Sequence, residues 1–411
     1  MARIVTKRNI LIALALVLLF GAINREHNLL YVMVSLLTSV LILAHLLPIY
    51  SLRCVSGGRS IQSAAFEGDV IDCHIRLANT GRGSRYMIEV VDSFPAGEPE
   101  LRSPMTFITR LRGRQERNYS FPLTCYKRGE YVIGPLRLRS AYPLGISSIS
   151  RTLPVPNPTL LVYPRVFEIP YIPLRANGYM PMLGVEVTSR AGGCEEFIGV
   201  REYKEGDSLK YIHWPSTAKH NRYIVKEFEI RASTEITIFL DLHSKSNIGK
   251  EKETTLEYAI KIAASIAKYA LERGHSIQIV GYGAKPLVIP YGKGINHMAR
   301  VLEELARAAA DGDIPCYRVV NDYSGMMRDG GTAVLLLPHF DGGTDEYLYS
   351  YSLLKAKRTN VISVFFDADS FRDDPKNAGP GDHTFAEELV GQGETVFFVH
   401  RGDNLQEVFS G

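Results

Sequence analysis

The sequence predicts a membrane-anchored protein of several domains: a transmembrane helical hairpin, an antiparallel β-sandwich, and a doubly wound α/β domain at the C-terminus. Three observations predict this fold class. Two uncharged apolar stretches occupy the first 50 residues, hydrophobicity then alternates with period two, and from residue 235 apolar strands alternate with helix-spaced segments. The length of 411 residues suits two or three folded units, at about 150 residues each.

Composition and charge exclude several classes of protein. With 45% hydrophobic and 22% charged residues, the chain is neither disordered nor a polytopic membrane protein. The net charge of +3 divides into +3 for residues 1–50, +6 for residues 51–160 and −6 for residues 161–411. This basic excess beside the apolar stretches favours anionic headgroups and is too diffuse for a nucleic-acid face. We therefore expect a membrane, and no nucleic acid, as partner.

The two apolar stretches predict a transmembrane hairpin within residues 1–52. Residues 29–50 form an uncharged stretch of 22 that can span a bilayer, for which about 20 residues are needed. Residues 10–23 form a shorter stretch of 14. Because Lys7 and Arg8 precede it, a cleaved signal peptide is the alternative, although the second stretch follows within a few residues.

Basic residues predict how this hairpin is oriented. They flank it at both ends, whereas the loop between the stretches holds one arginine balanced by one glutamate. The flanking residues are Arg3, Lys7, Arg8, Arg53 and Arg59. By the positive-inside rule we expect a two-pass protein of the cell inner membrane with its soluble domains in the cytoplasm. Five scattered cysteines without a CxxC pair also fit a reducing compartment.

Residues 53–162 predict an immunoglobulin-like β-sandwich. Residues 68–81 alternate apolar and polar side chains, and further short apolar runs follow between glycine and proline signals. No cluster of catalytic residue types lies on these strands, so we expect a spacer or interaction module. Six prolines between residues 154 and 173 then predict an extended connector, which together with the motif below covers residues 163–232.

Residues 233–411 predict a parallel, doubly wound sheet. We expect strands at residues 235–241, 276–281, 332–338, 360–367 and 394–400, and helices at residues 254–273, 296–310 and 345–357. Thr254 and Glu257 fit a capping box at the start of the first helix. Ligands bind beyond the carboxyl ends of such strands, where Asp241 and Asp341 are candidate metal ligands. The alternative is that these acids cap helices or face solvent.

Residues 193–230 are the segment richest in chemistry-bearing side chains. It holds the only tryptophan, Trp214, beside His213, among charges that would suit a network of charge-assisted hydrogen bonds. The candidate residues are Glu196, Arg201, Glu202, Tyr203, Gly206, Asp207, His213, Trp214, Lys219 and Glu227. Two interpretations stay open. One is a catalytic site in which His213 acts as acid/base with Asp207 and Glu202, and the other is a buried lock between connector and sheet.

This segment closely resembles the signature of the DUF58 family, which has the form eF.g.ReY..GD..r.IhW..tAr....vkEfE and runs into a strand that ends in Asp. The matching residues are Glu196, Phe197, Gly199, Arg201, Glu202, Tyr203, Gly206, Asp207, Ile212, His213, Trp214, Thr217, Ala218, Lys226, Glu227, Glu229 and Asp241. Lys219 stands where Arg is usual. Residues 126–146 also resemble the family's RGxYxxGP…DPxG stretch, with Ala141 and Tyr142 where an acid before the proline is typical.

The resemblance implies a membrane-anchored bacterial or archaeal protein whose C-terminal part is similar to a von Willebrand factor A domain. It implies a MoxR-type AAA+ ATPase and other membrane or von Willebrand A proteins as partners in assembly. The Mg²⁺ site of such domains reads DxSxS, but residues 241–246 read DLHSKS, which puts His243 and Lys245 at the hydroxyl positions. Since Lys245 would repel a cation, we expect no cofactor, with Mg²⁺ as the alternative.

The leading hypothesis is a non-enzymatic, membrane-tethered interaction protein that works with a MoxR-type ATPase on the assembly or maturation of complexes. The alternatives are a hydrolase or transferase with His213 as acid/base, and a Mg²⁺-dependent von Willebrand A adhesion module.

Overall fold

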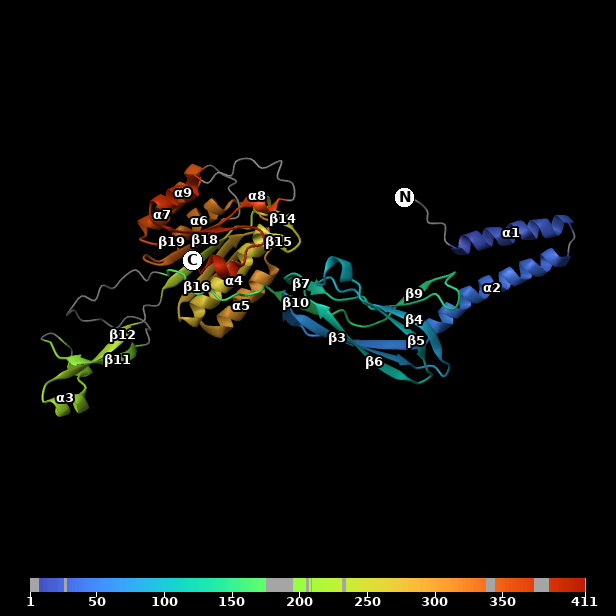
Figure 1. The fold of residues 1–411 in the computed structure, drawn as a ribbon, viewed down its shortest axis with the longest axis horizontal. Helices are drawn as coiled ribbons and strands as arrows, with labels where there is room; N and C mark the ends of the chain where they lie inside the picture. The colour runs from blue at the N-terminus through green and yellow to red at the C-terminus, as the bar shows by residue number, and fades with distance from the viewer. Residues whose placement is uncertain are drawn as a thin grey trace. The chain divides into compact units, whose positions relative to one another are not determined.

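The structure is a computed structural model that describes residues 7–25, 28–174, 195–204, 207, 209–230, 234–337, 344–372 and 384–410. The chain divides into two compact units, Met1–Tyr163 and Pro164–Gly411 (Figure 1). The first unit has a hydrophobic core of its own, and a second core lies in the second unit. Each unit is therefore described by itself.

The first unit begins with two helices, α1 (Lys7–Arg25) and α2 (Asn28–Leu52), which pack against each other. Both are long and apolar enough to cross a membrane, and few of their side chains are buried in the protein. Large apolar side chains such as Phe20 and Leu36 are exposed along them. Because exposing so much contiguous apolar surface to water is unfavourable, the pair is compatible with a membrane anchor.

A β domain of three small sheets follows the helices. The first sheet has the order β1 (Val55–Ser60), β3 (Val70–Asn79), β6 (Glu116–Thr124), and the second has the order β2 (Ala64–Phe66), β10 (Thr159–Tyr163), β7 (Gly129–Val132). The third has the order β5 (Met105–Leu111), β4 (Arg85–Val91), β8 (Arg137–Ser140), β9 (Ile149–Thr152). Only the β2–β10 pair is parallel; every other pair is antiparallel.

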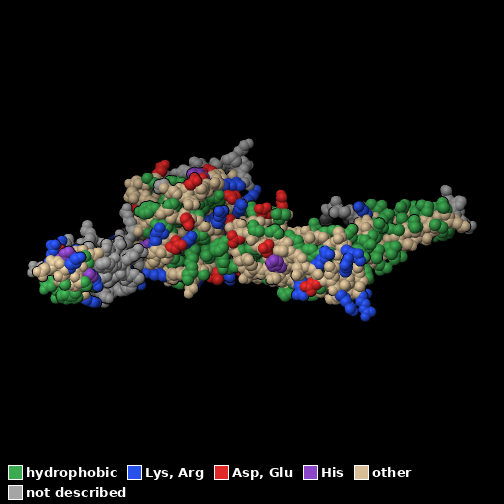
Figure 2. Space-filling model, turned by 60° about the horizontal axis from the view of Figure 1, so that its bottom comes forward, with side chains coloured by type: hydrophobic (Ala, Val, Ile, Leu, Met, Phe, Trp, Pro, Cys, Tyr) green, Lys and Arg blue, Asp and Glu red, His purple; other side chains and the backbone are tan. Residues whose placement is uncertain are grey.

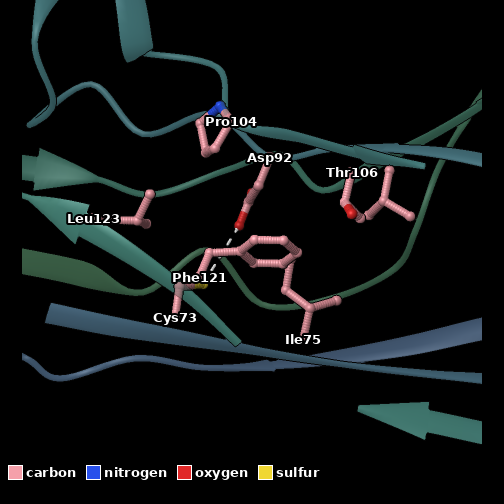
Figure 3. A pocket seen from close by; sticks show the side chains of 8 residues that line it. Cys73, Ile75, Asp92, Pro104, Thr106, Phe121 and Leu123 are labelled. Atoms are coloured by element: carbon pink, nitrogen blue, oxygen red, sulfur yellow. Dashed lines mark hydrogen bonds between the residues drawn. The ribbon is translucent and has the colours of Figure 1, made fainter. Parts of the chain in front are cut away.

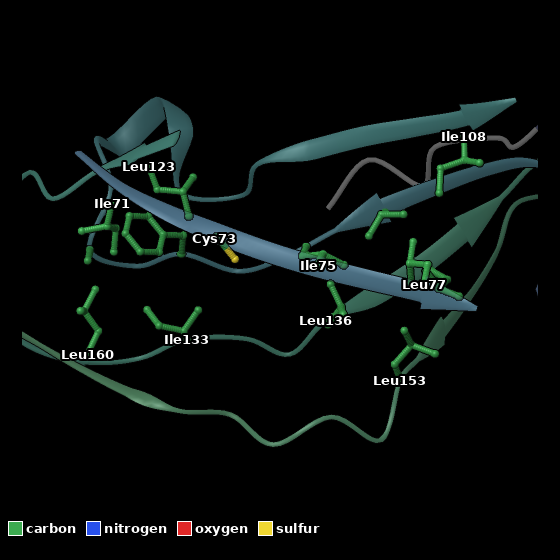
Figure 4. Packing of buried hydrophobic residues seen from close by; sticks show 14 of the residues in the cluster. Ile71, Cys73, Ile75, Leu77, Ile108, Leu123, Ile133, Leu136, Leu153 and Leu160 are labelled. Carbon is green, nitrogen blue, oxygen red and sulfur yellow. The ribbon is translucent and has the colours of Figure 1, made fainter. Parts of the chain in front are cut away.

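The period-two pattern of the sequence produces the core of this domain. Along β3, buried and exposed side chains alternate, and Cys73, Ile75 and Leu77 point inward. They meet Ile133 and Leu160 from segments later in the chain (Figure 4). The prediction of a β domain after the helices is confirmed.

One buried ion pair crosses this domain. Arg59 on β1 contacts Asp92, just after β4, at 2.6 Å between Nη1 and Oδ1, and their side chains are 0% and 4% exposed. Arg59 Nη2 also donates to the carbonyl oxygens of Ile133 (3.0 Å) and Pro156 (2.8 Å). One side chain thus connects four separate segments of the domain.

The second unit contains a six-stranded sheet covered by helices on both faces. The sheet has the order β17 (Pro286–Gly292), β16 (Ser276–Tyr282), β13 (Glu235–Leu240), β18 (Thr332–Leu337), β19 (Asn360–Phe366), β20 (Thr395–Val399). On one face pack α4 (Thr255–Glu272) and α5 (Gly294–Arg307); on the other pack α6 (Cys316–Ser324), α7 (Thr344–Ala356) and α9 (Thr384–Gly391) (Figure 1). Short elements fill the connections: η3 (Ser244–Ser246), β14 (Gly249–Lys250), β15 (Glu253–Thr254), α8 (Ala368–Phe371) and α10 (Leu405–Val408).

The sequence predicted this unit well, with two exceptions. Thr254 does cap α4, since its hydroxyl accepts from the Glu257 amide at 3.2 Å. The all-parallel sheet was wrong, because β17 pairs antiparallel with β16 and makes the sheet mixed. Only residues 283–285 separate the two strands, and so short a connection cannot hold the crossover that parallel pairing needs. Helices α6 and α9 and strand β17 itself were not predicted.

Candidate functional site

The DUF58-like signature folds as a β-hairpin whose connection carries a helix. Strands β11 (Glu195–Glu202) and β12 (Ile224–Ile230) pair antiparallel, with a register shift between Phe197 and Gly199. A 3-10 turn, η2 (Leu209–Tyr211), and helix α3 (Trp214–His220) lie between them. We call residues 195–230 the signature hairpin.

Arg201 and Asp207 form the tightest polar contact of the signature hairpin. Two guanidinium nitrogens of Arg201 donate to the two carboxylate oxygens of Asp207, at 2.7 and 2.8 Å. The Lys204 amide donates to the same carboxylate at 2.8 Å. These hydrogen bonds, first the one from Arg201, lower the pKa of Asp207 to about 2. Asp207 is thus a fixed anion that closes the loop after β11, not a proton donor at neutral pH.

His213 is the N-cap of α3. Its Nδ1 lies 2.7 Å from the Ser216 hydroxyl and accepts from the Ser216 amide at 3.3 Å. Its own amide donates to the carbonyl of Ile224 at 2.7 Å, which ties the start of α3 to β12. Pro215 occupies the first turn, where its missing amide costs nothing. The local sequence therefore gives this imidazole a structural role.

The three catalytic candidates have three different partners. Asp207 pairs with Arg201 and His213 contacts Ser216, whereas Glu202 pairs with Arg222 at the surface. Among the described residues, neither acid hydrogen-bonds to the imidazole. The structure brings these residues onto one hairpin without assembling them into an acid/base relay.

The exposed side chains of the signature hairpin are apolar and basic. Trp214 is 64% exposed, Leu209 68% and Tyr223 59%. Five exposed basic residues accompany them: Lys204, Lys210, Lys219, Arg222 and Lys226. The lock interpretation would bury Trp214, but this residue is exposed, and α3 has no buried residue. Sequence reasoning missed Leu209, Ser216 and Arg222, of which only Ser216, three residues after His213, carried a capping signal.

Several signature residues cannot be placed in the same detail. Tyr203 lies beside Tyr223, with ring centroids 6.1 Å apart. Glu196 and Glu227 take part in the β11–β12 ladder through their backbones, and their side chains are outside the described part of the chain. Gly206 lies outside the described residues altogether.

Asp241 occupies the carboxyl end of β13, where the strand order of the sheet reverses between β13 and β18. It is 4% exposed, and its Oδ1 accepts from the His243 amide at 2.9 Å. Burial and the nearby Asp241 carboxylate together raise the pKa of the Cys316 thiol well above its usual value. His243 is buried, whereas Lys245 is exposed. Asp241 therefore stabilises the turn that leaves β13.

The structure offers little for a metal at this edge. Asp341, the second candidate ligand, lies outside the described residues. In the described ranges, no group of three or more His, Cys, Asp or Glu side chains is arranged to hold a metal ion. Asp367, at the end of β19, caps α8 by accepting from the Asp369 amide at 3.2 Å.

The β domain contains a small hollow beside its buried ion pair (Figure 3). Asp92 and Cys73 point toward each other in it, with 4.0 Å between Oδ2 and Sγ. Burial, then the charge of Asp92, raises the pKa of Cys73 to about 11. The thiol therefore stays protonated and unreactive at neutral pH, and apolar side chains such as Ile75, Phe121 and Leu123 fill most of the wall.

Comparison with known proteins agrees with the resemblance seen in the sequence. Residues 199–364 match the family model described as "Protein of unknown function DUF58". The resemblance to DUF58 is confirmed. This DUF58 region extends from β11 to the middle of β19. The uncharacterized protein YeaD of Bacillus subtilis (strain 168) is 23% identical over 288 residues, which are 69% of each chain.

Two solved structures show weak likeness to parts of the chain. A CARDB domain of the PF1109 protein from Pyrococcus furiosus, solved with di-metal ions, has a TM-score of 0.20 and 10% identity, covering 26% of this chain and 86% of that domain. A β-glucosidase from Listeria innocua has a TM-score of 0.16 and 13% identity, covering 26% of this chain and 16% of the enzyme. Scores this low support no conclusion about the function of the DUF58 region.

Proposed function

We propose that this protein is a membrane-tethered docking protein and that its signature hairpin binds a partner protein. The observation that carries the proposal is the exposure of Trp214, Leu209 and Tyr223 together on the hairpin that holds the DUF58 signature. Large exposed aromatic side chains are costly in water and are the residues most enriched at the energetic centres of protein interfaces.

The charges of the signature hairpin define the kind of partner that fits. Five exposed basic residues lie on the same hairpin as the aromatic side chains, and Glu202, which pairs with Arg222, is the exposed acid among the described side chains of the hairpin. A partner should therefore present an acidic rim around an apolar pocket. We propose a MoxR-type AAA+ ATPase in this role, on the strength of the DUF58 resemblance, and assembly or maturation of a complex as the outcome.

The remaining parts of the proposal concern the helices, the β domain and the α/β domain. Helices α1 and α2 would tether the chain, with the soluble domains in the cytoplasm and the immunoglobulin-like β domain as spacer. The α/β domain would be von Willebrand A-like, which its strand order, its antiparallel edge strand β17 and the position of Asp241 support. Calorimetric titration with Mg²⁺ tests the adhesion alternative, since a working metal site of that kind should give a saturable heat signal, whether heat is released or absorbed.

The hydrolase or transferase alternative has less support. The contact between His213 and Ser216 resembles a nucleophile and its base, but the Ser216 amide donates to the same nitrogen. That pattern is the one expected of a helix cap, so we assign His213 to α3 and not to catalysis.

Measured binding of the full chain to the ATPase tests the proposal. The chain, purified in detergent, is immobilised and exposed to the ATPase held in its ATP-bound state. We expect Trp214→Ala to weaken binding by about thirtyfold, the effect of an interface hot-spot residue. Tyr223→Ala should also weaken it, while Tyr349→Ala is the matched control, because both tyrosines are 59% exposed but Tyr349 lies on α7.

Two results would overturn the proposal. One is unchanged affinity in Trp214→Ala, and the other is an equal loss in Tyr349→Ala, which would indicate general loss of structure. Failure of the wild-type chain to bind the ATPase in any nucleotide state would remove the proposed partner.

A further inference from the structure

We propose that the end of the β domain next to α2 is a binding surface for anionic phospholipid headgroups. This inference rests on the proposed function, in which α1 and α2 tether the chain to a membrane. It adds the class of lipid that the protein would bind. The surface consists of the junction between α2 and β1 and of the loops at residues 80–84 and 112–115. We call its four cationic residues, Arg53, Arg82, Arg112 and Arg114, the arginine collar.

The first loop of this surface is fixed to the end of α2. Thr80 donates to the carbonyl of Cys54 through its amide (2.8 Å) and its hydroxyl (3.0 Å). The guanidinium of Arg85 lies 4.0 Å from the ring centroid of Tyr50, in the last turn of α2. The Tyr50 hydroxyl fills the place where a side chain on Gly83 would begin. The loop therefore lies where the apolar helix ends.

The second loop is bound to the first. The Arg114 amide donates to the carbonyl of Gly81 at 3.0 Å, and Asn79 donates from one Nδ2 to the carbonyls of Gly83 (2.9 Å) and Arg112 (3.0 Å). A Cβ on Gly113 would collide with the carbonyl of Arg82. Backbone contacts this close hold three of the four arginines at defined positions, which lowers the entropy cost of binding a headgroup.

The four side chains of the arginine collar are available to bind a headgroup. All four residues are exposed, and none of them forms a side-chain hydrogen bond or an ion pair with another residue in the described part of the chain. Residues 80–86, 110–115 and 140–148 contain no acid. Figure 2 shows Lys and Arg side chains gathered on the β domain beside the apolar helices.

The opposite end of the β domain has mixed charge with a slight acidic excess. Its loops carry the acids Glu67, Asp69, Glu98 and Glu100 and the bases Arg102, Lys127 and Arg128. Strand β3 connects the two ends, because it starts at Val70 next to the acidic loop and ends at Asn79 under the arginine collar. The difference in net charge between the two ends favours the orientation in which the arginine collar faces an anionic surface.

Aromatic and apolar side chains complete the surface. Tyr86 and Tyr142 stack with ring centroids 5.8 Å apart, and Leu144, in the neighbouring loop, is 57% exposed. Tyrosine with nearby arginine is the composition found where a protein meets the headgroup layer. The same surface would be a poor match for an acidic peptide alone, because it joins directly to a helix long enough to span a bilayer.

Lipid selectivity of the full chain tests the inference. The chain is reconstituted in phosphatidylcholine bilayers that contain spin-labelled phosphatidylglycerol or spin-labelled phosphatidylcholine, and the relative association of the two is measured by electron paramagnetic resonance. Since each arginine near an anionic leaflet contributes roughly fivefold, we expect clear selectivity for phosphatidylglycerol that falls as salt is added.

Variants locate the effect. In the triple variant Arg82→Gln, Arg112→Gln and Arg114→Gln, the association of phosphatidylglycerol relative to phosphatidylcholine should fall to a ratio close to one. The control Lys245→Gln, Lys285→Gln and Arg300→Gln removes the same charge from exposed positions of the α/β domain and should leave selectivity unchanged. In addition, hydrogen exchange of residues 80–84 and 112–115 should slow in bilayers containing phosphatidylglycerol, in the wild-type chain only.

Each other outcome overturns the inference. If selectivity for phosphatidylglycerol survives the triple change, residues at the helix ends cause it and not the arginine collar. If both triple variants lose selectivity equally, it depends on the net charge of the chain and not on the position of the arginines. If hydrogen exchange in the two loops is the same with and without phosphatidylglycerol, the loops do not contact the headgroups. Release of the chain from membranes by alkaline carbonate would overturn the tether as well, whereas failure of the wild-type chain to bind the ATPase would overturn the proposed partner and leave the arginine collar untouched.

Discussion

At the scale of single residues, sequence chemistry predicted which side chains matter better than it predicted their partners. Arg201, Asp207 and His213 were all singled out, and each does form a defined contact in the signature hairpin. Their pairing could not be read from spacing, because the turn after β11 brings Asp207 back onto Arg201 while α3 draws His213 toward Ser216. The exposure of Trp214 could not be predicted from the sequence either, since a lone tryptophan is more often at least half-buried.

The Arg201–Asp207 pair predicts an acid transition of the signature hairpin. Because folding lowers the pKa of Asp207 to about 2, its stabilisation is present above the ordinary carboxyl value near 3.8 and is lost as pH falls from about 4 to 2. Trp214, the only tryptophan in the chain, reports on this hairpin by fluorescence. We expect a transition in that range for the wild type.

The matched variants make this prediction specific. In Asp207→Asn the transition should vanish and the hairpin should be less stable at neutral pH. Glu202→Gln, which alters an exposed pair with Arg222, should keep it. A transition of equal size in Asp207→Asn would contradict the role of this carboxylate.

At the scale of elements, periodicity was a reliable guide and pairing direction was not. The spacing of apolar residues predicted α4 with its Thr254 cap, and the five parallel strands of the sheet. It did not predict β17, which returns antiparallel, because Ile289 is the buried residue of this edge strand and its neighbours are exposed or half-buried, so no buried apolar run marks the strand. Helix α6 was missed because its nine residues, Cys316–Ser324, give too few turns for a clear period.

The buried Arg59–Asp92 pair makes a prediction about how the elements of the β domain hold together. Asp92→Leu should destabilise the domain by about 3–5 kcal/mol, because it leaves the Arg59 charge buried without its counterion. The double variant Arg59→Met/Asp92→Leu should recover part of the loss, but not the hydrogen bonds to Ile133 and Pro156. Native-state hydrogen exchange of β3 measures both.

An exposed ion pair of the same domain provides the control. Arg76→Met breaks the contact with Glu116, in which both side chains are substantially exposed, and should change the exchange of β3 very little. Equal effects of Asp92→Leu and Arg76→Met would show that burial does not decide the contribution of the pair.

At the scale of the whole molecule, the sequence predicted the succession of parts: apolar helices, a β domain, and an α/β domain that contains the DUF58 region. These features follow from composition and from repeating patterns that each part carries within itself. Where the signature hairpin and the arginine collar present their side chains could not be predicted in this way, because both depend on contacts between distant segments.

The orientation of the molecule in the membrane is the prediction at this scale. Basic residues at both ends of the helix pair predict that the termini of the hairpin lie in the cytoplasm. In intact cells, an epitope at the C-terminus should resist external protease and become sensitive after the membrane is permeabilised. Cleavage of the epitope in intact cells would show the opposite orientation, in which a cytoplasmic ATPase could not reach the soluble domains.

The short passage from helix α2 to the β domain has a mechanical consequence. Only Arg53 and Cys54 separate α2 from β1, and Arg151 holds the Leu52 carbonyl at 2.9 Å. No hinge is left at this junction, so the β domain cannot swivel independently of α2. If the tilt of α2 changes with the thickness of the bilayer, the β domain should rotate with the helix through the same angle.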